Sequence, residues 1–233
     1  MDGTKQAIRQ EMRRRRRALS AVDLDTTDRA VAEYVGSLPA FQAAKGIIAY
    51  AATDHEVPTA RLIEAAFGAG KRVYLPRLEG EVMSFAEYRR GVDLRPGAHG
   101  IPEPLGEQIE ARDLVEAVAF VPLLGWDDTG LRVGRGGGHY DRALAGPTRP
   151  GCLVGLGYTF QQCAAVPFDR WDLQLDWVVT ERGAVCCWRG GESTAASRKE
   201  GAIRDGIPDD GVGRRRAGRR AGLDGGSSPA PTS

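Results

Sequence analysis

The chain has 233 residues, 42% of them hydrophobic, and a formal net charge of +1 at pH 7, a composition that suits one globular domain with or without a tail. So small a net charge argues against a protein that binds nucleic acid through its overall field, and no apolar run is long enough to span a membrane. The four cysteines form no CxxC pair and no zinc pattern with the three histidines, and no apolar stretch follows the N-terminal arginines as it would in a secretory signal. We therefore expect a reduced, cytoplasmic protein.

The N-terminal part of the chain has the signals of two helices followed by a strand. Residues 5–19 form a very basic helical segment, and residues 23–38 keep the helical spacing of apolar side chains. Ser20 and Asp23 have the spacing of a capping box at the start of the second helix. Residues 46–52 are a short apolar run, which is typical of a buried strand.

Helix and strand signals continue to alternate toward the middle of the chain. Residues 58–67 have a helical pattern that ends at glycines, and residues 71–75 and 82–88 are typical of strands. Residues 91–106 are rich in proline and glycine, so we expect a loop there. A further strand is predicted over residues 115–123.

The segment that follows this strand, residues 130–142, holds five glycines, three arginines and one aspartate. Glycine lets backbone amides approach an anion closely, because no Cβ intervenes and a positive φ is cheap. Arg132, Arg135 and Arg142 would add positive charge, and Asp141 would hold a cation that itself binds phosphate. The spacing fits neither a Walker A loop nor a Rossmann fingerprint. The segment predicts a polyphosphate-binding loop, with an ordinary surface turn as the alternative.

The remaining signals complete an alternating pattern. A short helix is predicted over residues 141–144, and strands over residues 152–156, 177–180 and 184–188. Strands that alternate with helices predict a single-domain α/β fold, a mostly parallel sheet with helices on both faces in a Rossmann-like three-layer arrangement. Because such sheets bind ligands at their carboxyl edge, we expect Glu56 and the glycine-rich segment to converge there.

Composition changes near residue 190. Residues 190–233 are rich in Gly, Arg, Ser, Pro and Ala, and such a segment buries too little apolar surface to offset its ordering entropy. We therefore divide the chain into a globular domain, residues 1–189, and a disordered, dispensable tail, residues 190–233. The tail and the run Arg13 to Arg17 would suit a nucleic-acid-binding arm, but neither has interleaved aromatic residues, so we expect both to be solvated.

The glycine-rich segment and the strand before it resemble the signature of the 5-formyltetrahydrofolate cyclo-ligase family. Further motifs of that family appear in the expected order over about residues 5–183. They are Lys5 and Arg9, His55-Glu56-Val57-Pro58-Thr59, Leu75-Pro76-Arg77, Gly100-Ile101-Pro102-Glu103-Pro104 and Asp172-Leu173-Gln174-Leu175-Asp176. The chain departs from the family pattern at His139, where tyrosine is more usual, and in the order of residues around Arg132.

The resemblance implies an enzyme that cyclises 5-formyltetrahydrofolate to 5,10-methenyltetrahydrofolate, with ATP as co-substrate and Mg2+ as cofactor. ATP would phosphorylate the formyl oxygen, and ADP and phosphate would be released. The partners would then be small molecules alone. We expect a monomer without membrane or nucleic-acid partners.

The resemblance also implies roles for individual residues. Arg132, Arg135 and Tyr140 would act in catalysis, and Ala51, Glu56 and Tyr140 would contact the folate. Asp141 and Asp172 would ligate Mg2+, which prefers hard oxygen ligands. The residues that would bind ATP are Lys5, Arg9, Arg132, Val133, Gly134, Arg135, Gly136, Gly137, Gly138, His139 and Tyr140.

Alternatives remain for the function and for single residues. A phosphosugar isomerase or a CoA-transferase-like enzyme would share the architecture and an anion site, and His139 would suit a relative that binds folate or nucleotide without turnover. Glu56 would equally cap the helix at Pro58, and Asp172 would equally cap a turn. Lys5 and Arg9 would also suit a solvated basic face.

Overall fold

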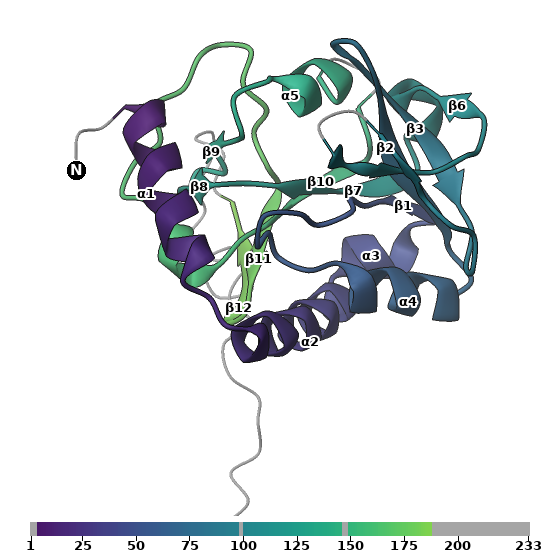
Figure 1. The fold of residues 1–233 in the computed structure, drawn as a ribbon, viewed down its shortest axis with the longest axis horizontal. Helices are drawn as coiled ribbons and strands as arrows, with labels where there is room; N and C mark the ends of the chain where they lie inside the picture. The colour runs from purple at the N-terminus through teal and green to yellow at the C-terminus, as the bar shows by residue number, and fades with distance from the viewer. Residues whose placement is uncertain (1–3, 98–99, 146–148, 188–233) are drawn as a thin grey trace, which may run out of the picture.

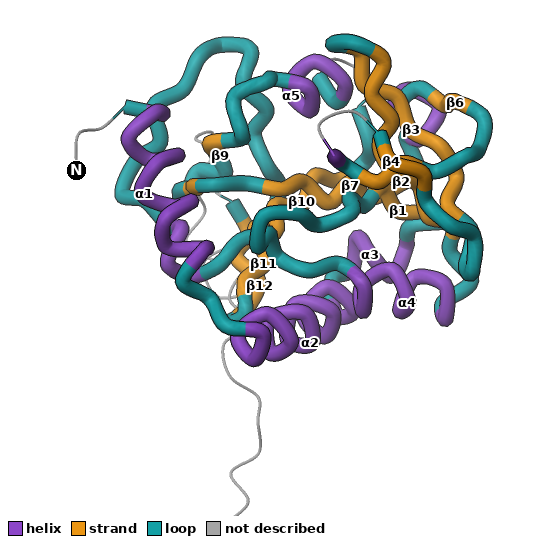
Figure 2. Tube along the Cα trace, viewed as in Figure 1, coloured by secondary structure: helices purple, strands orange, loops and turns teal. Residues whose placement is uncertain are grey.

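The computed structural model describes residues 4–97, 100–145 and 149–187. Within them, eight strands form one sheet in the order β12-β11-β10-β7-β1-β2-β3-β6 (Figure 1, Figure 2). Its strands are β1 (Gly46–Ile48), β2 (Arg72–Glu79), β3 (Val82–Tyr88), β6 (Gln108–Ile109), β7 (Ala117–Pro122), β10 (Cys152–Leu156), β11 (Trp177–Thr180) and β12 (Gly183–Cys186). Two small hairpins pair β4 (Arg95–Pro96) with β5 (Pro102–Glu103), and β8 (Gly125–Trp126) with β9 (Arg132–Val133). The helices are α1 (Lys5–Arg17), α2 (Ala21–Ser37), α3 (Pro39–Ala43), α4 (Ala60–Gly68), η2 (Ala111–Leu114), α5 (His139–Ala143) and η3 (Thr159–Gln161).

The centre of the sheet is parallel and its edges are antiparallel. β7 pairs in parallel with β1 and β10, while β2 and β11 extend the parallel part outward. β3, β6 and β12 then pair in the antiparallel sense. The predicted mostly parallel sheet is therefore confirmed, and its carboxyl edge is the edge at which β1 and β7 both end.

Helices pack on both faces of the sheet, as predicted. On one face, α2, α3 and α4 cover strand side chains that include Ile47, Val118 and Phe120 (Figure 1). The second face is covered more thinly, by η2, the end of α5 and the chain at residues 173–175, which contact Ile48 and Val121. Ile47 and Ile48 enter different clusters because successive side chains of a strand point to opposite faces.

Helix α1 lies beside the sheet rather than on it. Ile8 and Met12 are buried against Leu124, Val133 and Val166, so the helix docks on the β8–β9 hairpin (Figure 1). Side chains three or four positions apart share one face of a helix. Docking through residues 8 and 12 therefore turns the neighbouring positions 5, 9 and 16 toward the body of the protein.

Element boundaries differ from the predictions in modest ways. The capping box is present: the Ser20 side chain accepts from the Asp23 amide, and α2 begins at Ala21. The predicted loop at 91–106 contains the short strands β4 and β5. The tail predicted for residues 190–233 lies outside the described residues. Within the described ranges, no helix is long and apolar enough to cross a membrane.

The β8–β9 hairpin depends on one glycine at its turn. Gly130 has φ +84°, and a Cβ there would lie 2.4 Å from the Leu175 carbonyl oxygen and 2.9 Å from the Cys187 Cβ. Asp127 holds the same turn, because its Oδ1 accepts from the amides of Thr129 and Leu131. The hairpin delivers Arg132 and the glycine-rich segment to the carboxyl edge of the sheet.

We expect Gly130→Ala to destabilise the protein by about 2–4 kcal/mol, since it combines a left-handed backbone with overpacking. The control is Gly36→Ala in helix α2, where an added Cβ meets nothing within 4 Å. That change should stabilise the protein by about 0.5–1 kcal/mol, because alanine is the better helix former. Urea denaturation of both variants measures the two effects. Equal stabilities would contradict this account of the turn.

Candidate active site

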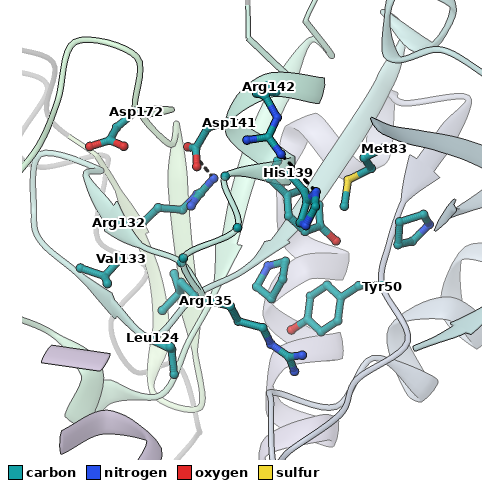
Figure 3. Close-up of a pocket in the computed structure, with 18 of the residues that line it drawn as sticks. Tyr50, Met83, Leu124, Arg132, Val133, Arg135, His139, Asp141, Arg142 and Asp172 are labelled. Carbon is teal, nitrogen blue, oxygen red and sulfur yellow. Dashed lines mark hydrogen bonds and ion pairs between the residues drawn. The ribbon is translucent and has the colours of Figure 1, made fainter. Parts of the chain in front are cut away.

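A cavity of about 780 Å³ opens at the carboxyl edge of the sheet (Figure 3), within the size range of small-molecule sites. It is formed by α1, the loop after β1, the segment after β9 and the loop at 169–172. Every site residue predicted from the sequence lines it. They are Lys5, Arg9, Ala51, Glu56, Arg132, Val133, Gly134, Arg135, Gly136, Gly137, Gly138, His139, Tyr140, Asp141 and Asp172. Segments more than a hundred residues apart therefore meet at one site.

The glycine-rich segment lines this cavity and has unpaired backbone amides. Gly136 and Gly138 have φ values of +113° and +64°, so the chain turns sharply where other residues would be strained. Within the described residues, the amides of residues 135–138 donate no hydrogen bond. Arg9 fixes the segment from α1, because its Nε donates to the Gly134 carbonyl oxygen at 2.9 Å. Four free N–H donors on one short turn favour an anion.

Arg132 is a buried cation at the base of the segment. Its side chain is 3% exposed, and its Nη2 donates to Asp141 Oδ1 at 2.9 Å. Burial lowers the pKa of Arg132, and the charge of Asp141 partly offsets this; the guanidinium stays charged at neutral pH. Its Nε has no hydrogen-bond partner within the described residues. A buried donor without a partner suits a site that completes its hydrogen bonds with a ligand.

Asp172 lies on the same side of the cavity as Asp141 and Arg132 (Figure 3) and is bound to α1. Lys5 Nζ contacts Asp172 Oδ2 at 2.5 Å and Asp169 Oδ2 at 2.9 Å. Burial lowers the pKa of Lys5, but the hydrogen bonds and charges of both aspartates outweigh it, so the pKa is raised. The Asp169 amide donates to Asp172 Oδ2 as well. Asp172 therefore caps this turn, as the alternative predicted, and it also lines the cavity.

Asp141 and Asp172 each keep one carboxylate oxygen free. Asp141 Oδ1 accepts from Arg132 and from the Leu173 amide, and neither Asp141 Oδ2 nor Asp172 Oδ1 accepts a hydrogen bond from any described residue. No group of three or more His, Cys, Asp or Glu residues in the described part could hold a metal by itself. Two carboxylates still fit Mg2+, which keeps several waters and shares the phosphates of its substrate.

Glu56 pairs with Arg135 in the loop after β1. Arg135 Nε donates to Glu56 Oε1 at 3.0 Å, and its Nη2 donates to the hydroxyl of Thr53 at 2.5 Å. Glu56 Oε2 accepts from the Thr53 amide at 3.1 Å. The alternative role as a helix cap is not seen, since α4 begins after Thr59 without a side-chain cap. In this structure Glu56 and Arg135, predicted to contact different substrates, hold each other.

Two tyrosines stand near this pair. Burial raises the pKa of Tyr140 well above its ordinary value, and the charge of Glu56 adds to the effect. Burial raises the pKa of Tyr50 in the same direction, and its hydroxyl donates to the Val57 carbonyl oxygen at 3.0 Å. Both hydroxyls therefore stay protonated at neutral pH and are suited to donate hydrogen bonds rather than to act as bases.

Several lining residues were not predicted from the sequence. Asp169 lies three residues before Asp172, and this spacing was the one available signal for it. Nothing in the sequence marks the apolar or aromatic residues that reach the cavity from other elements. They include Tyr50, Leu78, Met83 and Trp171, whereas Ile101 belongs to the motif Gly100-Ile101-Pro102-Glu103-Pro104. Trp126, next to the predicted loop, is a buried core residue.

The fold and the cavity define an α/β protein with a cavity lined by glycines and arginines at the carboxyl edge of its sheet. The chain belongs to the 5-formyltetrahydrofolate cyclo-ligase family, whose model matches residues 1–181. The 5-formyltetrahydrofolate cyclo-ligase of Haemophilus influenzae is 32% identical over 176 residues, 73% of this chain and 94% of that protein. The one from Escherichia coli K12 is 33% identical over 181 residues, 72% of this chain and 96% of that protein. The structure of Aquifex aeolicus 5,10-methenyltetrahydrofolate synthetase matches with a TM-score of 0.69 and 30% identity, covering 82% of this chain and 95% of that one.

Family membership confirms the predicted class of protein. It is an enzyme, a ligase of folate one-carbon metabolism with 5-formyltetrahydrofolate cyclo-ligase activity. The family implies ATP and a folate as substrates, which argues against the isomerase-like and CoA-transferase-like alternatives.

Proposed function

We propose that this protein cyclises 5-formyltetrahydrofolate to 5,10-methenyltetrahydrofolate at the described cavity, in a reaction that depends on ATP and Mg2+. The observation that carries the proposal is the arrangement of the cavity: the glycine-rich segment brings four unpaired amides and buried Arg132, and the loop after β1 brings Glu56, which is bonded to Arg135. The glycine-rich segment suits a polyphosphate, and the loop with Glu56 suits a neutral, hydrogen-bonding heterocycle.

The chemistry requires an activated formyl oxygen. That oxygen attacks the γ-phosphorus of ATP, the bond to the bridging oxygen breaks, and ADP leaves. The aminobenzoyl nitrogen of the folate then attacks the formyl carbon and loses its proton. The new carbon–nitrogen bond closes the ring as the carbon–oxygen bond breaks and phosphate departs. Catalysis of this kind is mostly positioning and neutralisation of charge on the transferring phosphoryl group.

The glycine-rich segment and its arginines would meet this need. Amides 135–138 would donate to phosphate oxygens, and Arg132 Nε and Arg135 would place positive charge beside them. Lys5 and Arg9 project from α1 into the same space. Their present partners, Asp172 and the Gly134 carbonyl, hold both side chains at the wall where a polyphosphate would lie.

Asp141 and Asp172 would hold Mg2+ through their free oxygens, with Leu173 and Arg132 fixing the first carboxylate and Lys5 the second. When bound, the ion would neutralise phosphate charge.

The folate would lie on the side of Glu56. The Glu56 carboxylate would accept hydrogen bonds from the pterin ring, while Ala51 and the Tyr140 hydroxyl would line the same space. Leu78, Met83 and Pro122 supply an apolar wall there. Such a wall with few polar groups is typical of a site that orients a flat ring.

The direct test is absorbance in the band of the methenyl product, with 5-formyltetrahydrofolate, Mg2+ and ATP. We expect a rise that needs both ATP and Mg2+. A folded protein that binds ATP but gives no rise would overturn the proposal and favour a relative without turnover. His139→Tyr, which restores the family's usual residue, would then be the next variant.

A further inference from the structure

The loop that carries Glu56 has a strained backbone. Asp54 and His55 have φ values of +52° and +53°, in the left-handed region that residues other than glycine rarely occupy. A chain left to itself would relax to extended or right-handed conformations. Two successive residues keep this conformation only where their surroundings hold them.

Arg16 of α1 holds this loop from one side. Its side chain is 2% exposed, although it lies in a run of five arginines expected to be solvated. Its Nη2 donates to the Asp54 carbonyl oxygen and, at 3.2 Å, to Asp54 Oδ2. The Arg16 carbonyl oxygen lies 2.9 Å from His55 Nδ1. The two strained residues are therefore both bound to one helical residue.

Burial has a consequence for the charge of Arg16. It lowers the pKa of the guanidinium, and the charges of Glu56 and Asp54 partly offset the shift. A buried cation is retained where its hydrogen bonds and its counter-charges compensate its desolvation. Here the compensation comes from the loop itself, so Arg16 and the loop conformation support each other.

Tyr158 holds the loop from the other side. Its hydroxyl donates to the carbonyl oxygens of His55 and Glu56, at 3.1 and 3.2 Å. Its ring stacks on Phe160 with a centroid distance of 5.2 Å, and the guanidinium of Arg15 lies 5.0 Å above the Phe160 ring. Tyr158 is itself fixed, and it contacts the backbone of Glu56 directly.

We propose that Arg16 and Tyr158 are positioning residues for folate binding, which hold Asp54 and His55 in the left-handed conformation that points the Glu56 carboxylate into the cavity. The proposal rests on the proposed role of Glu56 as the folate contact. Neither residue lines the cavity, so each acts through the loop.

Loss of Arg16 or of the Tyr158 hydroxyl should weaken folate binding more than nucleotide binding. When the loop is loosened, only a fraction of molecules presents Glu56 correctly, and the apparent dissociation constant rises in inverse proportion to that fraction. The residues proposed to bind ATP lie on the glycine-rich segment and on positions 5 and 9 of α1. These stay anchored by Ile8 and Met12 and by the bond from Arg9 to Gly134.

The test uses the full chain with Arg16→Met, Arg16→Lys and Tyr158→Phe. The matched control is Arg14→Met, on the same helix but with a side chain 71% exposed and bonded to Glu11. Calorimetry measures the dissociation constants of 5-formyltetrahydrofolate alone and of a non-hydrolysable ATP analogue alone. Steady-state assays add KM for each substrate and kcat.

We expect Arg16→Met to weaken 5-formyltetrahydrofolate binding about tenfold, equivalent to about 1.4 kcal/mol. Nucleotide binding and kcat at saturating folate should change less than about threefold. Arg16→Lys, which keeps one charged donor without the planar fork, should give an intermediate value. Arg14→Met should match the wild type. Tyr158→Phe removes only a hydroxyl, so it tests the same loop even where Arg16→Met fails to fold.

Failure of the proposed function and failure of this inference would give different results. A wild-type protein without ATP-dependent turnover would overturn the proposed function. A wild-type protein that turns over, combined with unchanged folate binding in both Arg16→Met and Tyr158→Phe, would overturn this inference alone. An equal loss of folate and nucleotide binding would also overturn it, because it would indicate general damage to the fold rather than a role in placing Glu56.

Discussion

Replacing Asp141 with asparagine should lower kcat/KM on the order of a hundredfold or more, because a proposed ligand of Mg2+ is lost. The amide oxygen of asparagine can still accept from Arg132 and from the Leu173 amide, as Asp141 Oδ1 does. Its nitrogen cannot ligate a cation in place of the free carboxylate oxygen. Activity measured against Mg2+ concentration should therefore recover in part at high Mg2+.

The same substitution should lower stability. Arg132, 3% exposed, would lose its counter-charge, at a cost of about 1–3 kcal/mol when the hydrogen bond is kept. Asp176→Asn is the control, since Asp176 forms a half-buried ion pair with Arg149 away from the cavity. Its melting temperature should fall without a change in Mg2+ dependence. Full activity of Asp141→Asn at ordinary Mg2+ would refute the metal-ligand assignment.

Replacing Arg135 with alanine should lower kcat/KM by roughly 10²–10³, the usual cost of removing one donor that stabilises developing charge. The variant should fold normally, because the Arg135 side chain is 39% exposed. KM for the folate should rise too, since Glu56 loses the guanidinium that fixes its Oε1. Steady-state kinetics with each substrate varied in turn measures both effects.

Two further substitutions provide comparisons for Arg135→Ala. Arg135→Lys keeps the charge but not the fork that reaches both Glu56 and Thr53, so an intermediate loss is expected. Arg29→Ala removes an exposed ion pair with Asp25 on α2 and should leave the kinetics unchanged. Retention of more than about a third of the wild-type kcat/KM in Arg135→Ala would remove Arg135 from the proposed catalytic group.

The proposed nucleotide site and the proposed positioning of Glu56 both depend on α1. The helix supplies Lys5 and Arg9 to the cavity and Arg16 to the loop after β1, while Ile8 and Met12 seal it against the β8–β9 hairpin. Positions 5, 8, 9, 12 and 16 lie along one face because the helix has 3.6 residues per turn. A single docked helix thus spans both proposed substrate sites.

Much of this protein follows from local sequence. The alternation of helix and strand signals determined the α/β fold, and the spacing of Ser20 and Asp23 determined the start of α2. The glycines of residues 130–142 marked a segment that lines the cavity. These features depend on local backbone conformation and on side chains a few residues apart, so the order of residues in the sequence is enough to predict them. The motifs that resemble the family identified each predicted residue of the cavity.

Other features were decided only by the tertiary structure. Arg16 looks the same as its arginine neighbours in the sequence, and its burial depends on a loop some forty residues away that needs a buried cation. The pairing of Lys5 with Asp172 and that of Glu56 with Arg135 likewise join distant segments. Met83 reaches the cavity from β3, which carries no signal of function, and Trp171 reaches it from the position before Asp172, where its own residue type indicates no role. Contacts between distant parts of the chain leave no periodic trace in it, because they depend on how the elements pack.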